Sequence, residues 1–103
     1  MKTETDQFKR AYKEEAEEWL ADLEAALLEL EEAPDKSGLI GRIFRAVHTI
    51  KGSGAMFGFE EIAAFTHEVE AVLDLVRSGE IPVSRELISL TLLACDQIRQ
   101  MAE

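Results

Sequence analysis

The sequence predicts an all-α fold, specifically an antiparallel up-down four-helix bundle. Apolar residues recur at spacings of three and four along most of the 103 residues, which is the helical period. Helix-breaking residues, among them Pro34, Gly58 and Gly79, fall between four such segments. The connections are short, and no segment alternates as a strand does, so neighbouring helices should run antiparallel around one core.

Length and charge limit the possible functions. A chain of 103 residues suits a single domain spanning 1–103, and 47% hydrophobic residues are enough for a modest core. The net charge of −10 argues against nucleic acid or an anionic membrane as a partner, since both bind basic surfaces. The lone Cys95 can form no internal disulfide, and no run of ~20 apolar residues is present, so we expect a cytoplasmic protein.

The first helix is expected from about residue 3 to 33, ending before Pro34. Thr3 and Thr5 are its candidate N-caps. At ~1.5 Å per residue it would be roughly 45 Å long, a length typical of bundle helices. Its apolar stripe consists of Phe8, Tyr12, Ala16, Trp19, Leu23, Leu27 and Leu30.

Three further helices are expected, over 37–56, 60–78 and 85–102. Gly79 is a suitable stop for the third, and Ser84 a suitable N-cap for the fourth. In the second helix the inward positions are Ile40, Ile43, Phe44, Val47, Ile50 and Gly54. In the third they are Ile62, Phe65, Val69, Val72, Leu73 and Val76, and in the fourth Leu87, Ile88, Thr91, Cys95 and Ile98.

One stretch of the second predicted helix concentrates unusual residues: AVHTIKGSGAMFGF, residues 46–59, holds one of the two histidines. At 100° per residue, His48 lies about 120° from the inward direction, which predicts an exposed side chain. Gly52 follows one turn later near the same face, and Lys51 lies closer to the core edge. Glycine inside a helix costs roughly 0.5–1 kcal/mol relative to alanine, so Gly52 requires a compensating role.

The third predicted helix carries a matching polar flank. His67 and Glu70 lie one turn apart on the same side, with Glu70 about 110° from the centre of the apolar stripe. Because a short loop makes the two helices antiparallel neighbours, we expect His48 and Lys51 to face His67 and Glu70 across the groove.

Phosphoryl acceptance is the chemistry that suits this set. A neutral imidazole has one ring nitrogen with a free lone pair that can attack phosphorus. A carboxylate such as Glu70 can accept a hydrogen bond from the other ring N–H, which fixes the tautomer. Lys51 can neutralise phosphate charge, and Gly52 leaves room for a bulky nucleotide or a partner's active site.

The same residues carry a family resemblance. HTIKGSGAMFGF, followed by HEVEAVLDLVRSGEI, resembles the HPt domain at the N-terminus of CheA-type chemotaxis histidine kinases. The H-x-x-K-G-S core is shared by HPt domains generally, and the flanking residues are similar to the CheA class more narrowly. The resemblance covers most of the chain, from the first helix to the fourth.

The resemblance implies a role for each site residue. His48 would be the phosphorylated residue, Lys51 and Gly52 match the motif's lysine and glycine, and His67 and Glu70 match polar residues that hydrogen-bond around the imidazole. In this family an ATP-binding kinase domain, commonly in trans within a dimer, phosphorylates the histidine. The phosphoryl group then passes to an aspartate of a response-regulator receiver domain.

The resemblance also implies limits. CheA-type HPt domains often carry a fifth helix, which we expect to be absent or truncated here because the sequence stops near the end of the fourth. The sequence has no nucleotide-binding motif, so we expect a phosphoacceptor module that is not an enzyme on its own, holds no cofactor or metal, and is monomeric when isolated. ATP and Mg would bind the partner kinase domain.

Two other interpretations stay open from the residues alone. The first is an interaction-only helical docking bundle with an incidental histidine. The second is a zinc site using His48, His67 and Glu70, which an exposed position and the neighbouring Lys51 disfavour.

Overall fold

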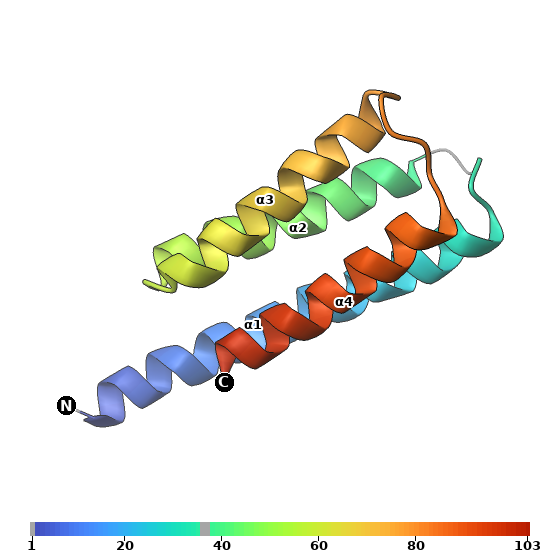
Figure 1. Cartoon of the computed structure of the whole chain (residues 1–103). Helices are drawn as coiled ribbons and strands as arrows, with labels where there is room; N and C mark the ends of the chain where they lie inside the picture. Colours follow the sequence, from blue (N-terminus) through green and yellow to red (C-terminus); the bar gives the residue numbers. More distant parts are fainter. Residues whose placement is uncertain (1, 36–37) are drawn as a thin grey trace.

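The structure, a computed structural model, confirms the all-α fold (Figure 1). It describes the backbone of residues 2–35 and 38–103, and the side chains of residues 7–35 and 38–103. This part of the chain forms four helices and no strand: α1 (Lys2–Glu32), α2 (Leu39–Met56), α3 (Glu60–Arg77) and α4 (Arg85–Ala102).

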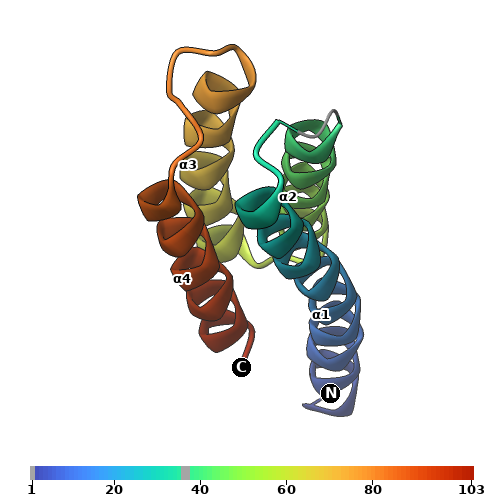
Figure 2. The ribbon, with the colours of Figure 1, turned by 90° about the vertical axis from the view of Figure 1, so that its right-hand side faces the viewer.

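The helices run antiparallel in sequence order, and each packs against two neighbours: α1 and α3 both contact α2 and α4. The molecule measures 49 × 21 × 20 Å, because α1 is much longer than the other helices. The first turns of α1 extend past the C-terminal end of α4, as both views show (Figures 1 and 2). The closest packing is between α2 and α3, the two helices that carry the predicted site.

The helix ends fall within two residues of the predicted positions. The first helix ends at Glu32, just before Pro34, while the candidate caps Thr3 and Thr5 lie outside the residues whose side chains are described. The second helix begins at Leu39 after Gly38, whose φ of 89° suits glycine. The predicted start at residue 37 lies outside the described residues.

The connection between α3 and α4 follows its sequence signals closely. After α3 ends at Arg77, Gly79 adopts φ 84°, and the Glu80 N–H donates to the Leu75 carbonyl at 2.9 Å. This is the backbone reversal that a glycine permits at a helix end. The Ser84 Oγ accepts a hydrogen bond from the Leu87 N–H at 3.1 Å, so the predicted N-cap is confirmed.

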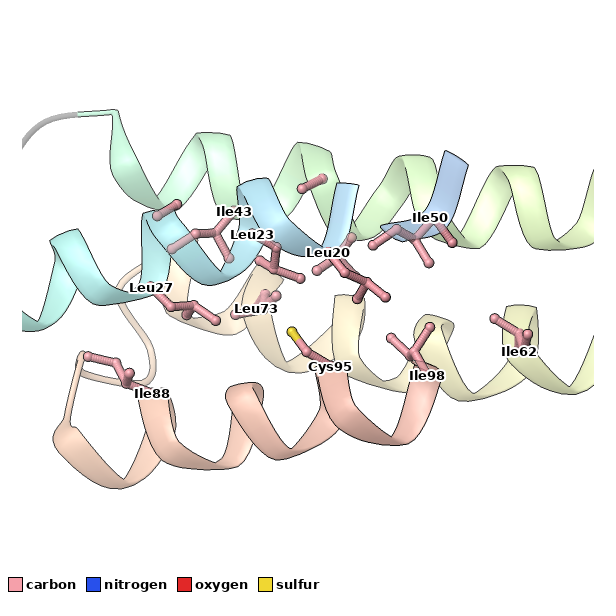
Figure 3. Close-up of a cluster of buried hydrophobic side chains, with 14 of the residues drawn as sticks. Leu20, Leu23, Leu27, Ile43, Ile50, Ile62, Leu73, Ile88, Cys95 and Ile98 are labelled. Carbon is pink, nitrogen blue, oxygen red and sulfur yellow. The ribbon is translucent and has the colours of Figure 1, made fainter. Parts of the chain in front are cut away.

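The core contains apolar residues of all four helices (Figure 3). Most predicted inward positions are buried or half-buried, but Phe8 and Val72 are 62% and 43% exposed, so their assignment to the core was wrong. Phe8 lies near the start of α1, where its ring meets Phe57 edge-on at a centroid distance of 6.3 Å and borders an open hollow. Val72 borders a shallow groove between the loosely packed α3 and α4. The largest fully buried apolar side chains are Tyr12, Leu20, Leu23, Leu27, Leu30, Ile43, Val47, Ile50, Ile62, Cys95 and Ile98.

Close packing around Gly54 fixes the end of α2 that carries the site. A Cβ at this glycine would lie 3.2 Å from the Tyr12 hydroxyl and 3.5 Å from the Ala63 nitrogen, so α2, α1 and α3 meet closely here. The Tyr12 ring contacts the rings of Phe57 and Phe59 at centroid distances of 5.6 and 4.6 Å. The inward orientation predicted for Gly54 is therefore confirmed.

Two arginines bind the long first helix to its neighbours. Arg42 of α2 donates to Asp22 at 2.6 Å, and Arg99 of α4 donates to Glu24 at 2.6 Å. The hydrogen bonds from these arginines hold the pKa values of Asp22 and Glu24 below their ordinary values. Such partly exposed pairs contribute little stability individually but set which faces of the helices meet.

Candidate functional site

His48 lies in the middle of α2 and projects from the bundle, with its side chain 63% exposed. Its neighbours Val47 and Ile50 are fully buried, which fixes the rotation of the helix and hence the direction of the histidine. The exposure predicted from the helical period is confirmed. A rigid helix thus presents the imidazole to solvent and to any approaching molecule.

Glu70 of α3 joins the two basic residues of α2. The His48 Nδ1–H donates to its Oε2 at 2.5 Å, and the Lys51 Nζ donates to its Oε1 at 2.6 Å. The Glu70 side chain is only 12% exposed. The sequence placed it on a polar flank outside the apolar stripe, and it is buried because α2 packs over that flank.

The ionisation of Glu70 determines which nitrogen of His48 is free. Burial pushes the pKa of this carboxyl up, but the hydrogen bonds from Lys51 and His48 outweigh burial, and the pKa lies below its ordinary value of 4.5. The carboxyl is therefore ionised at neutral pH and can only accept hydrogen bonds. Nδ1 must carry the proton of a neutral His48, which leaves the lone pair on Nε2.

Lys51 is held inside the site rather than extended into solvent. Its side chain is 25% exposed, and its ammonium contacts the carboxylate that also holds His48. Much of its positive charge is therefore offset by Glu70. The sequence predicted that Lys51 would face Glu70, but it assigned the ammonium to an incoming phosphate rather than to this carboxylate.

His67 and Gly52 lie at the rim of the site. The His67 Nδ1 is 3.8 Å from Glu70 Oε1, within ion-pair range but longer than a hydrogen bond, and its side chain is 64% exposed. A Cβ placed on Gly52 would meet no atom within 4 Å. Nothing in the described part of the chain therefore requires a glycine at position 52.

Sequence reasoning missed a second group beside His48. The Phe44 ring is nearly parallel to the imidazole, with an interplanar angle of 11° and centroids 6.4 Å apart, and Arg77 places its guanidinium carbon 4.0 Å from the Phe44 ring centre. The spacing gives only part of this group: Phe44 precedes His48 by one helical turn, but the contact of Arg77 with Phe44 depends on how α3 packs against α2. Phe44 had been assigned to the core alone.

Other kinds of site find no support in the described residues. They contain no group of three or more His, Cys, Asp or Glu side chains placed to hold a metal ion. None of the helices in this part of the chain has the length and apolar character needed to cross a membrane.

Comparisons with known proteins agree with this geometry. Residues 7–102 match the Hpt domain family. The chain is 38% identical to the chemotaxis protein CheA of Borreliella burgdorferi over 95% of its length, and 40% identical to that of Klebsiella aerogenes over its whole length. It spans only 11% and 16% of those two proteins.

Solved structures show the same fold. The CheA phosphotransferase domain from Thermotoga maritima superposes with a TM-score of 0.88 at 34% identity, covering 93% of this chain and 91% of that one. The phosphorylated P1 domain of CheA3 from R. sphaeroides, solved in complex with CheY6, gives 0.83 at 32% identity, covering 94% and 76%. The chain therefore belongs to the Hpt domain family, within the group formed by the phosphotransferase domains of CheA.

Proposed function

We propose that this chain is the phosphotransfer module of a two-component signalling system of the chemotaxis type. His48 accepts a phosphoryl group from an ATP-bound kinase domain and passes it to an aspartate of a receiver domain. The observation that carries the proposal is the hydrogen bond of 2.5 Å between His48 Nδ1 and Glu70, made by an imidazole that is 63% exposed.

In the first transfer, the lone pair of Nε2 forms the N–P bond. The bond between phosphorus and the donor's leaving oxygen breaks, and its electron pair leaves with the nucleoside diphosphate. Nδ1 keeps its proton, so the phosphorylated ring carries a positive charge. Glu70 stabilises that charge through the same hydrogen bond, and no proton has to leave the site.

In the second transfer, an aspartate oxygen of the receiver attacks phosphorus, and the N–P electron pair returns to Nε2. The ring becomes neutral again in its original tautomer. The P1 domain of CheA3, which resembles this chain, was solved with CheY6, and this supports a receiver domain as partner. The likeness to CheA proteins supports a kinase domain as the other partner.

The remaining residues act through Glu70 or by leaving space. The Lys51 ammonium donates to the second oxygen of Glu70 and so orients the carboxylate. It can bind the phosphoryl group only if it gives up this hydrogen bond. His67 supports the same carboxylate from the rim. Gly52 keeps the surface beside His48 free of side-chain atoms, which suits the close approach of another protein's active site.

The module does not catalyse phosphorylation alone. Residues 1–103 act as one monomeric domain, and ATP and Mg bind the partner kinase domain rather than this chain. We place it in the cytoplasm, in line with its likeness to CheA and with a buried cysteine in the free thiol form.

Transfer from labelled ATP tests this proposal, using the catalytic region of a CheA-type kinase. The wild-type chain should become labelled, and His48→Gln should not. His67→Gln is the matched control, because it removes the other exposed histidine, 64% exposed, and should keep the label. The label should be lost in acid and kept in alkali, as a phosphoramidate bond requires.

Absence of label on the folded wild-type chain would leave a mismatched kinase as an explanation. Labelling with phosphoramidate excludes that explanation, because this small donor needs no recognition by a protein partner. If phosphoramidate also fails to label His48, the chain is not a phosphoacceptor, and the docking bundle with an incidental histidine becomes the better account.

A further inference from the structure

A basic hollow lies beside His48, on the side toward the start of α2. It has a volume of about 410 Å³ and is lined by Gly41, Phe44, Arg45, His48, Thr49 and Arg77. Two of these residues are arginines, in a chain whose net charge is −10. We refer to these six residues as the arginine hollow.

The two arginines are available to an anion in different ways. The guanidinium of Arg77 is held over Phe44 at 4.0 Å and donates to Asp74 at 2.6 Å. That hydrogen bond uses one of its five N–H groups, and within the described residues the others have no acceptor. Arg45 makes no ion pair in the part of the chain that the structure describes, so its charge is not offset by a neighbouring carboxylate.

Lys51 is not available to bind an anion in the unphosphorylated site. Its ammonium is bound to Glu70, and moving it to a phosphate would remove one of the two hydrogen bonds that orient the carboxylate. The phosphoryl group brings close to two negative charges to Nε2, the nitrogen that points away from Glu70. Other cations beside that nitrogen would offset them.

We infer that the arginine hollow binds the phosphoryl group itself, with Arg45 and Arg77 donating to its oxygens during transfer and in the phosphorylated histidine. Arg45 lies three residues before His48, on the neighbouring row of the helix surface. Its guanidinium extends back over Gly41, with Nη1 3.7 Å from a Cβ placed there, so it has to turn toward Nε2 to bind the phosphoryl group. Arg77 is positioned by Phe44, whose ring lies parallel to the imidazole. This inference rests on the proposed function and adds the residues that recognise the transferred group.

Phosphoramidate provides the test, because its reaction involves no partner protein. The rate of His48 phosphorylation would be compared for wild type, Arg45→Gln, Arg77→Gln and the double variant. Arg10→Gln is the charge-matched control for each single variant, since Arg10 is an exposed arginine of α1 outside the hollow. Each single variant should react about tenfold more slowly, the effect of losing one charge-assisted hydrogen bond, and the double variant more slowly still, while Arg10→Gln should match wild type.

Phosphorus NMR measures the pKa of the phosphoryl group, which would not change if the two arginines only stabilised the fold. Cations beside the phosphoryl group favour its dianion, so the second phosphoryl pKa should rise in the double variant. Lys51, His67 and the two carboxylates Glu70 and Asp74 are unchanged in that comparison and cannot produce the difference.

Three results overturn the inference or what it rests on. Equal phosphoramidate rates and equal phosphoryl pKa values in wild type and the double variant overturn it. Slower phosphorylation of the double variant that appears only with the kinase region also overturns it, because the arginines would then bind the partner protein. If neither donor labels His48 in the wild-type chain, the proposed function fails instead.

Discussion

The imidazole of His48 and the carboxylate of Glu70 are joined by a hydrogen bond from Nδ1–H to Oε2, 2.5 Å long, across the interface of α2 and α3. The carboxylate is buried and ionised, while the imidazole is exposed. One partner is therefore fixed by the fold, and the other is presented to solvent in a single tautomer. The proposed chemistry of the site depends on this asymmetry.

Replacing Glu70 with glutamine should slow phosphorylation of His48 from phosphoramidate by roughly tenfold or more, the size of effect typical when a partner that orients a reactive histidine is lost. The amide can still accept from Nδ1–H but carries no charge to stabilise the phosphorylated ring. Glu68→Gln is the matched control, an exposed glutamate of the same helix that should leave the rate unchanged. Equal rates for Glu70→Gln and Glu68→Gln would show that Glu70 does not activate His48.

Gly52→Ala should stabilise the domain and impair its exchange with partners. Apart from the neighbouring backbone of α2 itself, no atom of the described residues lies within 4 Å of the added methyl group, so the free energy of unfolding should rise by roughly 0.5–1 kcal/mol, the propensity difference between the two residues. Transfer from the kinase region should slow, while the reaction with phosphoramidate should not. Denaturant unfolding and the two labelling assays measure these effects; unchanged kinase-dependent transfer would remove the role proposed for Gly52.

Gly54→Ala should have the opposite effect on stability. Its methyl group would lie 3.2 Å from the hydroxyl of Tyr12, a fully buried side chain that would have to shift by a few tenths of an ångström. Overpacking of this kind costs about 1–3 kcal/mol, more than the helix propensity gained. Denaturant unfolding should show a lower free energy than wild type, and a gain similar to that of Gly52→Ala would contradict the packing described here.

The contribution of Glu70 to stability should depend on pH. Its pKa in the folded protein lies below 4.5 because the hydrogen bonds from Lys51 and His48 outweigh the effect of burial. A lowered pKa stabilises the folded state above the unfolded value, and that contribution is lost as pH falls through the folded value. The difference in free energy of unfolding between wild type and Glu70→Gln should therefore shrink below about pH 4.5.

Urea unfolding at a series of pH values measures this difference. The carboxylates paired with arginine, Asp22 and Glu24, are present in both proteins, so their titration cancels. A difference that stays constant from neutral pH down to about pH 3 would mean that Glu70 gains no net favourable interaction in its ionised form.

The thiol of Cys95 should be inert in the folded protein. Its side chain is fully buried in α4, and burial raises its pKa to about 12, so almost no thiolate forms at pH 8. A thiol reagent should react only when the protein unfolds, with a rate that follows the denaturant-induced population of the unfolded state. Rapid reaction of the native protein would show that α4 opens locally or packs differently.

The helical spacing of the apolar residues and the glycine and proline residues between the helices made most of the fold predictable. Gly79 and Ser84 act through backbone geometry that only a few residue types allow, so the boundary between α3 and α4 could be read to within one residue. Phe8 could not be assigned correctly, because its exposure depends on where α4 ends relative to α1. The position of one helix end relative to another helix depends on tertiary packing, and the local sequence does not indicate it.

The site was predictable in its members but not in all its contacts. The helical period gave the direction of His48, because the buried neighbours on its own helix fix that direction. The burial of Glu70 and its bond to Lys51 arise from the packing of α3 against α2, which the period of one helix does not contain. The same holds for Arg77 over Phe44, two residues from different helices.

The position of phosphorus on the imidazole shows whether Glu70 selects the nitrogen of His48 that reacts. The ¹⁵N-labelled chain would be phosphorylated with phosphoramidate, and the nitrogen coupled to phosphorus identified by NMR. Because Glu70 holds Nδ1–H, phosphorus should be found on Nε2 of His48, with the Nδ1 proton retained and protected from exchange. Phosphorus on Nδ1 of His48, or on His67, would contradict this expectation.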